Sequence, residues 1–97
     1  MNKLQLSITI KDSEKTIFDG FARAVSSVSN KGKFDVLPYH ANFIALIQEQ
    51  ITIYDLDPNK KPQIIPIEEG VIKVKDNEIK VILGVKTKAV QTSTKSK

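Results

Sequence analysis

The fold is decided by the stretch VIKVKDNEIKVIL, residues 71–83. On both sides of Asp76-Asn77, apolar residues largely alternate with polar ones. This period of two is typical of a strand with one buried face, and a pair such as Asp-Asn readily forms a two-residue hairpin turn. The stretch therefore predicts a β-hairpin.

Outside the hairpin, the sequence divides into short apolar runs separated by turn residues. Pro38 and the segments 30–33 and 57–60 are typical of turns and loops, because Asn, Gly and Pro favour the backbone angles that turns need. With the two arms of the hairpin, the sequence predicts about nine short strands, at residues 4–10, 16–18, 21–29, 34–37, 43–47, 51–54, 64–67, 72–75 and 79–83. Short strands with frequent turns indicate an all-β sandwich or barrel.

Three local patterns refine this outline. Asp19-Gly20 is expected to end the strand 16–18 in a hairpin or sharp corner, and Gln48-Glu49 could form another tight turn. Pro62 and Pro66 favour an edge strand or a bulge, because proline cannot donate a ladder hydrogen bond. The spacing of apolar residues in 41–50 is compatible with a helix as well as a strand.

The charge of the chain is unevenly distributed. The 97 residues include 15 Lys and Arg and 11 Asp and Glu, which gives a formal net charge of +4. Residues 86–97 carry four lysines and no acidic residue, so the predicted domain, residues 1–85, is neutral. Because 86–97 is rich in Lys, Ser and Thr, we expect a disordered basic tail. A neutral domain does not favour nucleic acid as a partner.

Residues that could carry catalysis are scarce. There is no cysteine, and the single histidine, His40, has no second residue with which to hold a metal. The acidic pairs Asp55/Asp57 and Glu68/Glu69 lie beside turn signals, where carboxylates commonly bond to the local backbone. The four glycines are isolated, and no nucleotide-binding fingerprint occurs. We therefore expect a domain that is not an enzyme and that has no cofactor and no metal site.

The sequence also lacks the signals that would place it in a membrane. No apolar run approaches the roughly 18 residues that cross a bilayer, and the N-terminus has no basic stretch followed by an apolar signal segment. We expect a chain on the cytosolic or matrix side.

Three stretches, in the same order and spacing, resemble the ε subunit of F-type ATP synthases. GKFDVLPYHA at 32–41 is similar to the family stretch that contains Leu-Pro-Gly-His-Ala-Pro. EKTIFDG at 14–20 resembles the family's apolar-Phe-x-Gly corner, and EGVIKVKDNEIKV at 69–81 resembles its Gly-Gly-Phe-x-x-Val hairpin. The resemblance spans about residues 4–85.

The sequence departs from the family pattern at five positions. Asp35, Tyr39 and Glu69 stand where the family usually has glycine. Lys33 replaces an acidic residue, and Asn42 replaces the proline that follows His-Ala. These changes concentrate in and around the loop that follows Pro38.

The resemblance implies a ten-stranded β-sandwich that is a non-catalytic subunit of the central stalk. It would couple the γ subunit to the ring of c subunits during proton-driven ATP synthesis, as a peripheral protein on the cytoplasmic face of the membrane. The ε subunit usually continues into two inhibitory helices, for which residues 86–97 are too short and too rich in Ser and Thr. We therefore expect coupling without strong inhibition of ATP hydrolysis. The alternative is a free-standing β-sandwich interaction module unrelated to ATP synthase.

The resemblance also assigns roles to individual residues. It places the loop formed by Pro38, Tyr39, His40, Ala41 and Asn42 at the c-ring or γ interface. His40 would either contact a partner or bond to its own loop backbone. Positions with a structural role in the family motifs are Phe18, Gly20, Gly32, Phe34, Leu37 and Gly70. The three glycines among them are predicted to be turn positions with positive φ.

Overall fold

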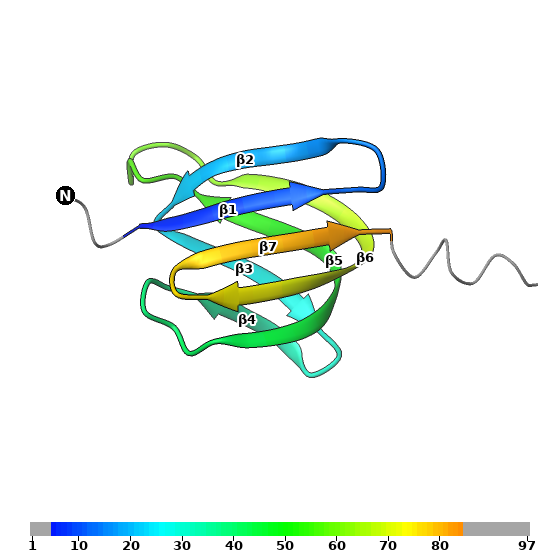
Figure 1. The fold of residues 1–97 in the computed structure, drawn as a ribbon. Helices are drawn as coiled ribbons and strands as arrows, with labels where there is room; N and C mark the ends of the chain where they lie inside the picture. Colours follow the sequence, from blue (N-terminus) through cyan, green and yellow to red (C-terminus); the bar gives the residue numbers. More distant parts are fainter. Residues whose placement is uncertain (1–4, 85–97) are drawn as a thin grey trace, which may run out of the picture.

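The computed structural model describes residues 5–84, and this range contains seven β-strands and no helix (Figure 1). The strands form one sheet in the order β2-β1-β7-β6-β5-β3-β4, in which only the β1–β7 pair is parallel. Their bounds are β1 Leu6–Lys11, β2 Thr16–Ala22, β3 Ala24–Ser29, β4 Gly32–Val36, β5 Phe43–Tyr54, β6 Gln63–Lys75 and β7 Glu78–Leu83. The all-β prediction is confirmed, and the segment 41–50 is strand from Phe43 onward rather than helix.

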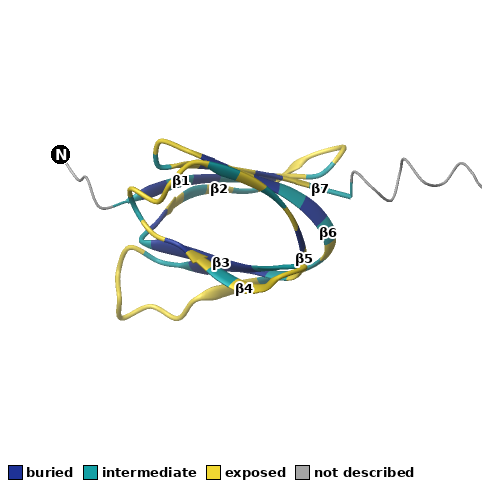
Figure 2. Cartoon of the chain, turned by 90° about the horizontal axis from the view of Figure 1, so that it is seen from below, coloured by how far each residue is buried: buried dark blue, intermediate teal, exposed yellow. Residues whose placement is uncertain are grey.

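The single sheet folds over into two layers because β5 and β6 are long and pass from one layer to the other (Figure 2). β5 pairs with β6 over 43–53, but only its residues 48–54 also pair with β3. In β6, only residues 70–75 also pair with β7. One layer therefore holds β2, β1, β7 and the adjoining halves of β6 and β5, and the other holds the remaining halves with β3 and β4. This architecture is a β-sandwich.

The bends in β5 and β6 explain why the predicted number of strands was too high. Counted as separate halves, β5 and β6 bring the seven strands to nine segments, which correspond one by one to the nine predicted strands. The tight turn predicted at Gln48-Glu49 is wrong, because β5 continues through it. The register with β6 shifts there instead, with Glu68 as the extra residue and Glu49 at φ 73°. Such β-bulges bend a strand without ending it.

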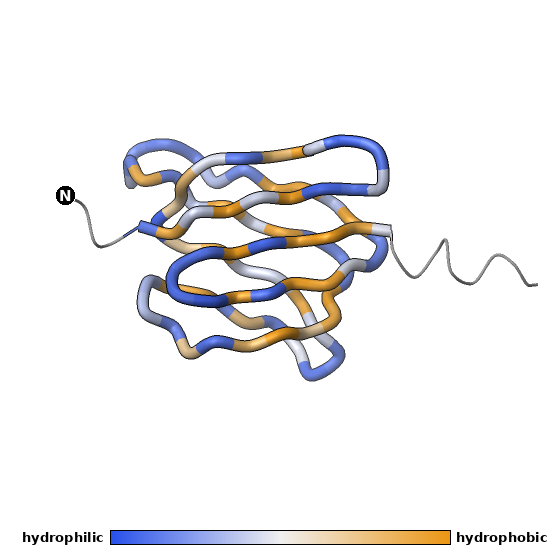
Figure 3. Tube along the Cα trace, viewed as in Figure 1, coloured by the Kyte–Doolittle hydropathy of each residue, from blue (hydrophilic) through white to orange (hydrophobic). Residues whose placement is uncertain are grey.

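The hairpin that decides the fold is confirmed as β6–β7. Lys75 pairs with Glu78, and both residues of the turn have positive φ, 52° at Asp76 and 66° at Asn77. Two positive φ values define the type I′ turn, whose twist suits a two-residue hairpin. Hydrophobic and hydrophilic residues alternate along both arms in Figure 3. The apolar set of each arm faces the core, as the alternation predicts.

The corner predicted at Asp19-Gly20 is wrong. β2 runs through this pair to Ala22, with Asp19 opposite Thr9 and Gly20 opposite Ile8 on β1. The chain turns instead at Arg23, whose backbone N–H donates to the carbonyl of Tyr54 at 2.9 Å. Pairing along β1 therefore overrides the local turn preference of Asp-Gly.

The core lies between the two layers and consists of aliphatic side chains. Thirteen buried residues form one cluster, namely Leu6, Ile8, Ile10, Ala22, Val25, Val36, Ile47, Ile51, Ile53, Ile72, Val74, Ile79 and Val81. Every one of the seven strands contributes at least one of them, so the closing of the two layers is what removes them from water. Burial of aliphatic surface is the main force that holds such a sandwich together.

The proline and tail predictions have different outcomes. Pro66 lies in the half of β6 that pairs only with β5, so it stands on a free edge of the sheet, as predicted. Pro62 precedes β6. The predicted basic tail, residues 86–97, and the predicted domain boundary at residue 85 lie outside the described residues.

Candidate protein interface at the loop 38–42

The loop that follows β4 begins with a tight turn. The N–H of His40 donates to the carbonyl of Leu37 at 3.0 Å, and Pro38 and Tyr39 are the two central residues. Tyr39 has φ 68°. Proline followed by a residue of positive φ is the pattern of a type II turn, in which glycine usually takes the second central position. Tyr39 therefore has the left-handed backbone that a glycine would be expected to supply at this position of the family motif.

Two asparagine side chains fasten this loop to the β6–β7 turn. Oδ1 of Asn77 accepts a hydrogen bond from the N–H of Tyr39 at 2.6 Å, and Oδ1 of Asn42 accepts one from the N–H of Asp76 at 3.1 Å. We call these two bonds the asparagine latch. The backbone carbonyl of Asn77 also accepts a bond from the N–H of Ser7 at 2.9 Å. Loop, turn and the start of β1 thus lie together at one end of the sandwich, the left end in Figure 1.

The role of Asn77 was not predicted from the sequence. Its position in an Asp-Asn pair marks it as a turn residue, and its positive φ agrees with that. Its side-chain bond to Tyr39 joins residues 38 positions apart. Only the packing of β4 and the hairpin at the same end of the sandwich brings them together, so no local pattern could have indicated this contact.

His40 lies on the surface of the loop and contacts residues of its own chain. Its Nδ1–H donates to the carbonyl of Ala41 at 2.8 Å. Its ring centroid is 5.2 Å from that of Phe43, which in turn is 5.7 Å from Phe34 in an edge-to-face arrangement. Of the two roles considered for His40, the bond to its own loop backbone is present in the structure. The contact with a partner stays a prediction.

The loop presents apolar side chains to solvent although its backbone is held in place. Leu37 is 55% exposed and Tyr39 is 65% exposed. Ala41 and Asn42 are exposed as well, while Pro38 is half-buried. Exposed apolar groups on a backbone that is already ordered suit binding, since little further ordering is required when a partner docks.

The aromatic and glycine residues of the family motifs have structural roles, but not all of them in turns. Phe18 and Phe34 are half-buried and pack against the core cluster. Gly32 has φ 116°, as predicted for a turn glycine. The same prediction is wrong for Gly20 and Gly70, which lie inside strands and do not have positive φ.

Gly70 is required for a different reason, the close approach of two strands. A Cβ at this position would lie 2.8 Å from the carbonyl oxygen of Ile82 and 2.8 Å from Cδ2 of Leu83. Contacts that short force neighbouring atoms to move. At Gly20, a Cβ would lie 3.4 Å from the ring of Phe18, which is an ordinary contact.

The described residues contain no arrangement suited to metal chemistry. Within residues 5–84, no three His, Cys, Asp or Glu side chains gather closely enough to hold a metal ion. In the same range, no helix has the length and apolar character needed to span a bilayer.

Taken together, the fold and the loop define a class of protein: a small β-sandwich with an ordered loop that exposes apolar side chains. A family model described as "ATP synthase, Delta/Epsilon chain, beta-sandwich domain" matches residues 4–87. Because this match covers most of the sequence, the chain belongs to the ATP synthase delta/epsilon family and comprises its β-sandwich domain.

Curated relatives agree with this assignment. The ATP synthase epsilon chain of Clostridium botulinum is 36% identical over 81 residues, which are 82% of this chain and 59% of that protein. The ATP synthase epsilon chain of Leptospira interrogans is 26% identical over 82 residues, which are 84% of this chain and 63% of that protein. The chain thus spans about three fifths of the length of these relatives.

Solved structures show the same fold at low sequence identity. A chain of the mitochondrial ATP synthase of Euglena gracilis, from a structure of its OSCP, F1 and c-ring, matches with a TM-score of 0.75 and 17% identity, over 82% of this chain and 51% of that chain. A chain from the central stalk and c-ring of the Tetrahymena thermophila mitochondrial enzyme matches with a TM-score of 0.67 and 15% identity, over 98% of this chain and 78% of that chain.

Proposed function

We propose that this protein is a non-catalytic subunit of the central stalk of an F-type ATP synthase, where it links the γ subunit to the c-ring. Within the assembly it would be a peripheral protein on the cytoplasmic face of the membrane. Its loop 38–42 would form part of the contact with the c-ring or with γ. Membership in the delta/epsilon family supports the assignment to this assembly.

The observation that carries the proposal for the loop is the asparagine latch. A part that transmits rotation must not yield at its contacts, and the latch joins the exposed residues around Tyr39 to the β6–β7 hairpin through two hydrogen bonds. The hairpin is itself bonded along β1. A force applied to the loop is therefore transmitted to the sheet, because the loop cannot move independently of the hairpin.

The proposal is tested by association with the cognate γ subunit and c-ring. The full chain is added to an ATP synthase complex that lacks this subunit, and its retention is measured by co-purification. Ala41→Glu places a charge on the exposed part of the loop and is expected to weaken retention at least about tenfold. Asn30→Glu is the matched control, because Asn30 is an exposed residue of the β3–β4 turn, and this turn lies at the opposite end of the sandwich (Figure 1).

The possible results separate the parts of the proposal. Retention of the unmodified chain, lost in Ala41→Glu but kept in Asn30→Glu, supports it in full. Equal retention of both variants would show that the loop contacts neither the c-ring nor γ, and binding to γ without the c-ring would show that the loop is not the c-ring contact. Failure of the unmodified chain to join the complex would favour the free-standing interaction module instead.

A further inference from the structure

The sheet has four free edges in its described part, and they differ in their protection. An unprotected edge strand exposes unpaired backbone groups to any other strand, and proteins usually block such pairing with charged residues, proline or bulges. β2 has Asp19 within its free edge, β4 has Lys33 and Asp35, and residues 63–67 of β6 include Pro66. Each of these three edges is therefore protected.

The fourth free edge, residues 43–47 of β5, has none of these devices. Its five residues are Phe43, Ile44, Ala45, Leu46 and Ile47, none of which is charged or a proline. This segment pairs only with β6. In Figure 1 it is the outermost strand segment of the front layer. We call residues 43–47 the open edge.

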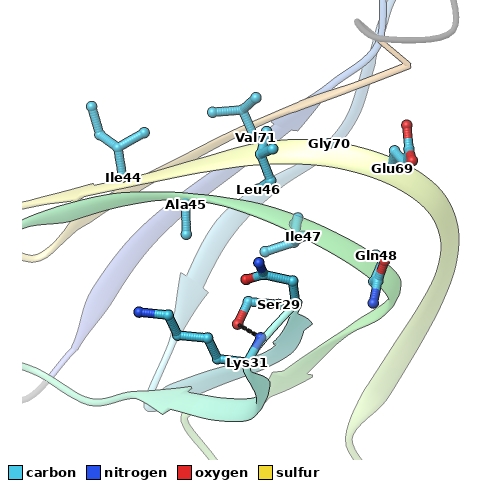
Figure 4. Close-up of a pocket in the computed structure, with 11 residues that line it drawn as sticks. Ser29, Lys31, Ile44, Ala45, Leu46, Ile47, Gln48, Glu69, Gly70 and Val71 are labelled. Carbon is cyan, nitrogen blue, oxygen red and sulfur yellow. Dashed lines mark hydrogen bonds between the residues drawn. The ribbon is translucent and has the colours of Figure 1, made fainter.

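The open edge also carries the two most exposed of the large apolar side chains in the described chain. Leu46 is 72% exposed and Ile44 is 67% exposed, and both lie on the outer face of the sheet. A groove of about 640 Å³ runs beside the edge, bounded on its far side by the β3–β4 turn with Ser29 and Lys31. Figure 4 shows Ala45 and Ile47 directed toward that turn and Ile44 directed away from it. Within the described chain, no strand pairs with the side of the open edge that faces away from β6.

We infer that the open edge pairs with the open edge of a second copy of this chain, in antiparallel orientation about Ala45. In that register, Ile44 of each copy stands opposite Leu46 of the other, so both exposed apolar side chains are covered by direct cross-strand neighbours. No charge on the edge opposes a like charge across the pair. The edge is thus complementary to itself, which is what a twofold contact requires.

The contact is small, and small contacts are usually weak. Five residues of strand span about 17 Å, which gives a short interface of the kind found in weak and transient complexes. We therefore expect a monomer at low concentration and a dimer that becomes populated between about 0.1 and 1 mM protein. The inference does not rest on the proposed function, since it concerns the chain alone.

Sedimentation equilibrium of the full 97-residue chain, from about 10 µM to about 1 mM, tests the association. The double variant Ile44→Lys with Leu46→Lys is expected to weaken the dimer at least about tenfold, because it replaces two apolar pairs by facing cations. Ile64→Lys is the matched control, since Ile64 is also exposed but lies on the edge protected by Pro66. Far-UV circular dichroism checks that all variants fold.

Hydrogen exchange distinguishes edge pairing from packing of the apolar outer faces. Amides of the open edge that do not bond to β6 should exchange more slowly at about 1 mM than at about 10 µM, whereas those of the β2 edge should not change. A chain that stays monomeric up to about 1 mM overturns the inference. So does a dimer that survives the double lysine variant, or one that leaves exchange in the open edge unchanged.

Discussion

The two halves of β5 both contain large aliphatic residues, but they differ in the number of strands beside them. In residues 48–54, β3 and β6 flank the strand, and Ile51 and Ile53 are buried. In the open edge, only β6 flanks the strand, and Ile44 and Leu46 are exposed. The β-bulge at Gln48-Glu49 separates the halves. Ile47, in the open edge, is nevertheless buried, so burial of an isoleucine here depends on which face of the sheet its side chain occupies, more than on its own strand's composition.

The largest effect is expected from truncating one isoleucine in each half. Ile51→Ala removes a fully buried side chain from the core and should lower the free energy of unfolding by about 3 to 4 kcal/mol. Ile44→Ala removes a side chain that already lies in water and should change it by less than about 0.5 kcal/mol. Urea denaturation of dilute protein measures both. Similar losses in the two variants would contradict the comparison.

A smaller loss is expected from Gly70→Ala, where the two halves of β5 meet. Gly70 pairs with Ile47, and the added Cβ would lie 2.8 Å from the carbonyl oxygen of Ile82. Forcing those strands apart should cost about 2 kcal/mol in unfolding free energy, by urea denaturation. Gly20→Ala is the control, because its Cβ meets only an ordinary contact with the Phe18 ring. A loss at Gly20 as large as that at Gly70 would refute the explanation by close approach.

Breaking the asparagine latch should loosen the loop 38–42 that leads into the open edge, while the other half of β5 remains unchanged. Asn77→Gly keeps a residue that accepts positive φ but removes the acceptor for Tyr39 N–H, at a cost of about 1 kcal/mol. Amide exchange at Tyr39 should become about fivefold faster, with no change in residues 48–54.

The control for the latch is Asn77→Asp, which retains an oxygen at the same place. Exchange at Tyr39 should stay close to that of the unmodified chain in this variant. If Asn77→Gly and Asn77→Asp accelerate exchange equally, the side-chain bond is not what holds the loop.

The smallest effect is expected at the bulge that divides β5, and it is a gain. Glu49 has φ 73°, a region in which side chains are strained and glycine is not. Glu49→Gly should therefore raise the free energy of unfolding by about 0.5 to 1 kcal/mol, whereas Glu49→Ala should bring no gain. Thermal unfolding monitored by circular dichroism is sensitive enough to detect such a difference. A loss in Glu49→Gly would mean that the Glu49 side chain stabilises the bulge.

Strand segments such as β1 and β7 could be predicted from alternation because each has one buried face, whereas β3, in which residues 24–27 are all buried, has no such alternation. Their connections could not be predicted with the same success. Gln48-Glu49 and Asp76-Asn77 both contain positive φ, yet the first is a bulge and the second a hairpin turn. After the bulge, the chain continues to pair with the same neighbouring strand, whereas after the hairpin turn it folds back onto the strand before the turn. Which of these happens is determined by the sheet as a whole.

The candidate loop was predicted from the resemblance, and its internal structure only in part. The family pattern has glycine where this chain has Tyr39, and the backbone there is left-handed. The bonds of Asn42 and Asn77 to that region cross 34 and 38 positions of sequence. Contacts of this kind follow from the order of strands in the sheet, so residue patterns alone do not reveal them.

The parallel pair β1–β7 has a consequence for synthesis on the ribosome. Its partners, from Ser7 opposite Glu78 to Lys11 opposite Ile82, join two ends of the described chain. At about 5 to 20 residues per second, the ribosome needs about 4 to 14 s to make β7 after β1. During that time β1 has only β2 beside it, and a two-stranded hairpin is marginally stable in water. Nascent chains should therefore stay vulnerable to proteases until β7 has left the exit tunnel.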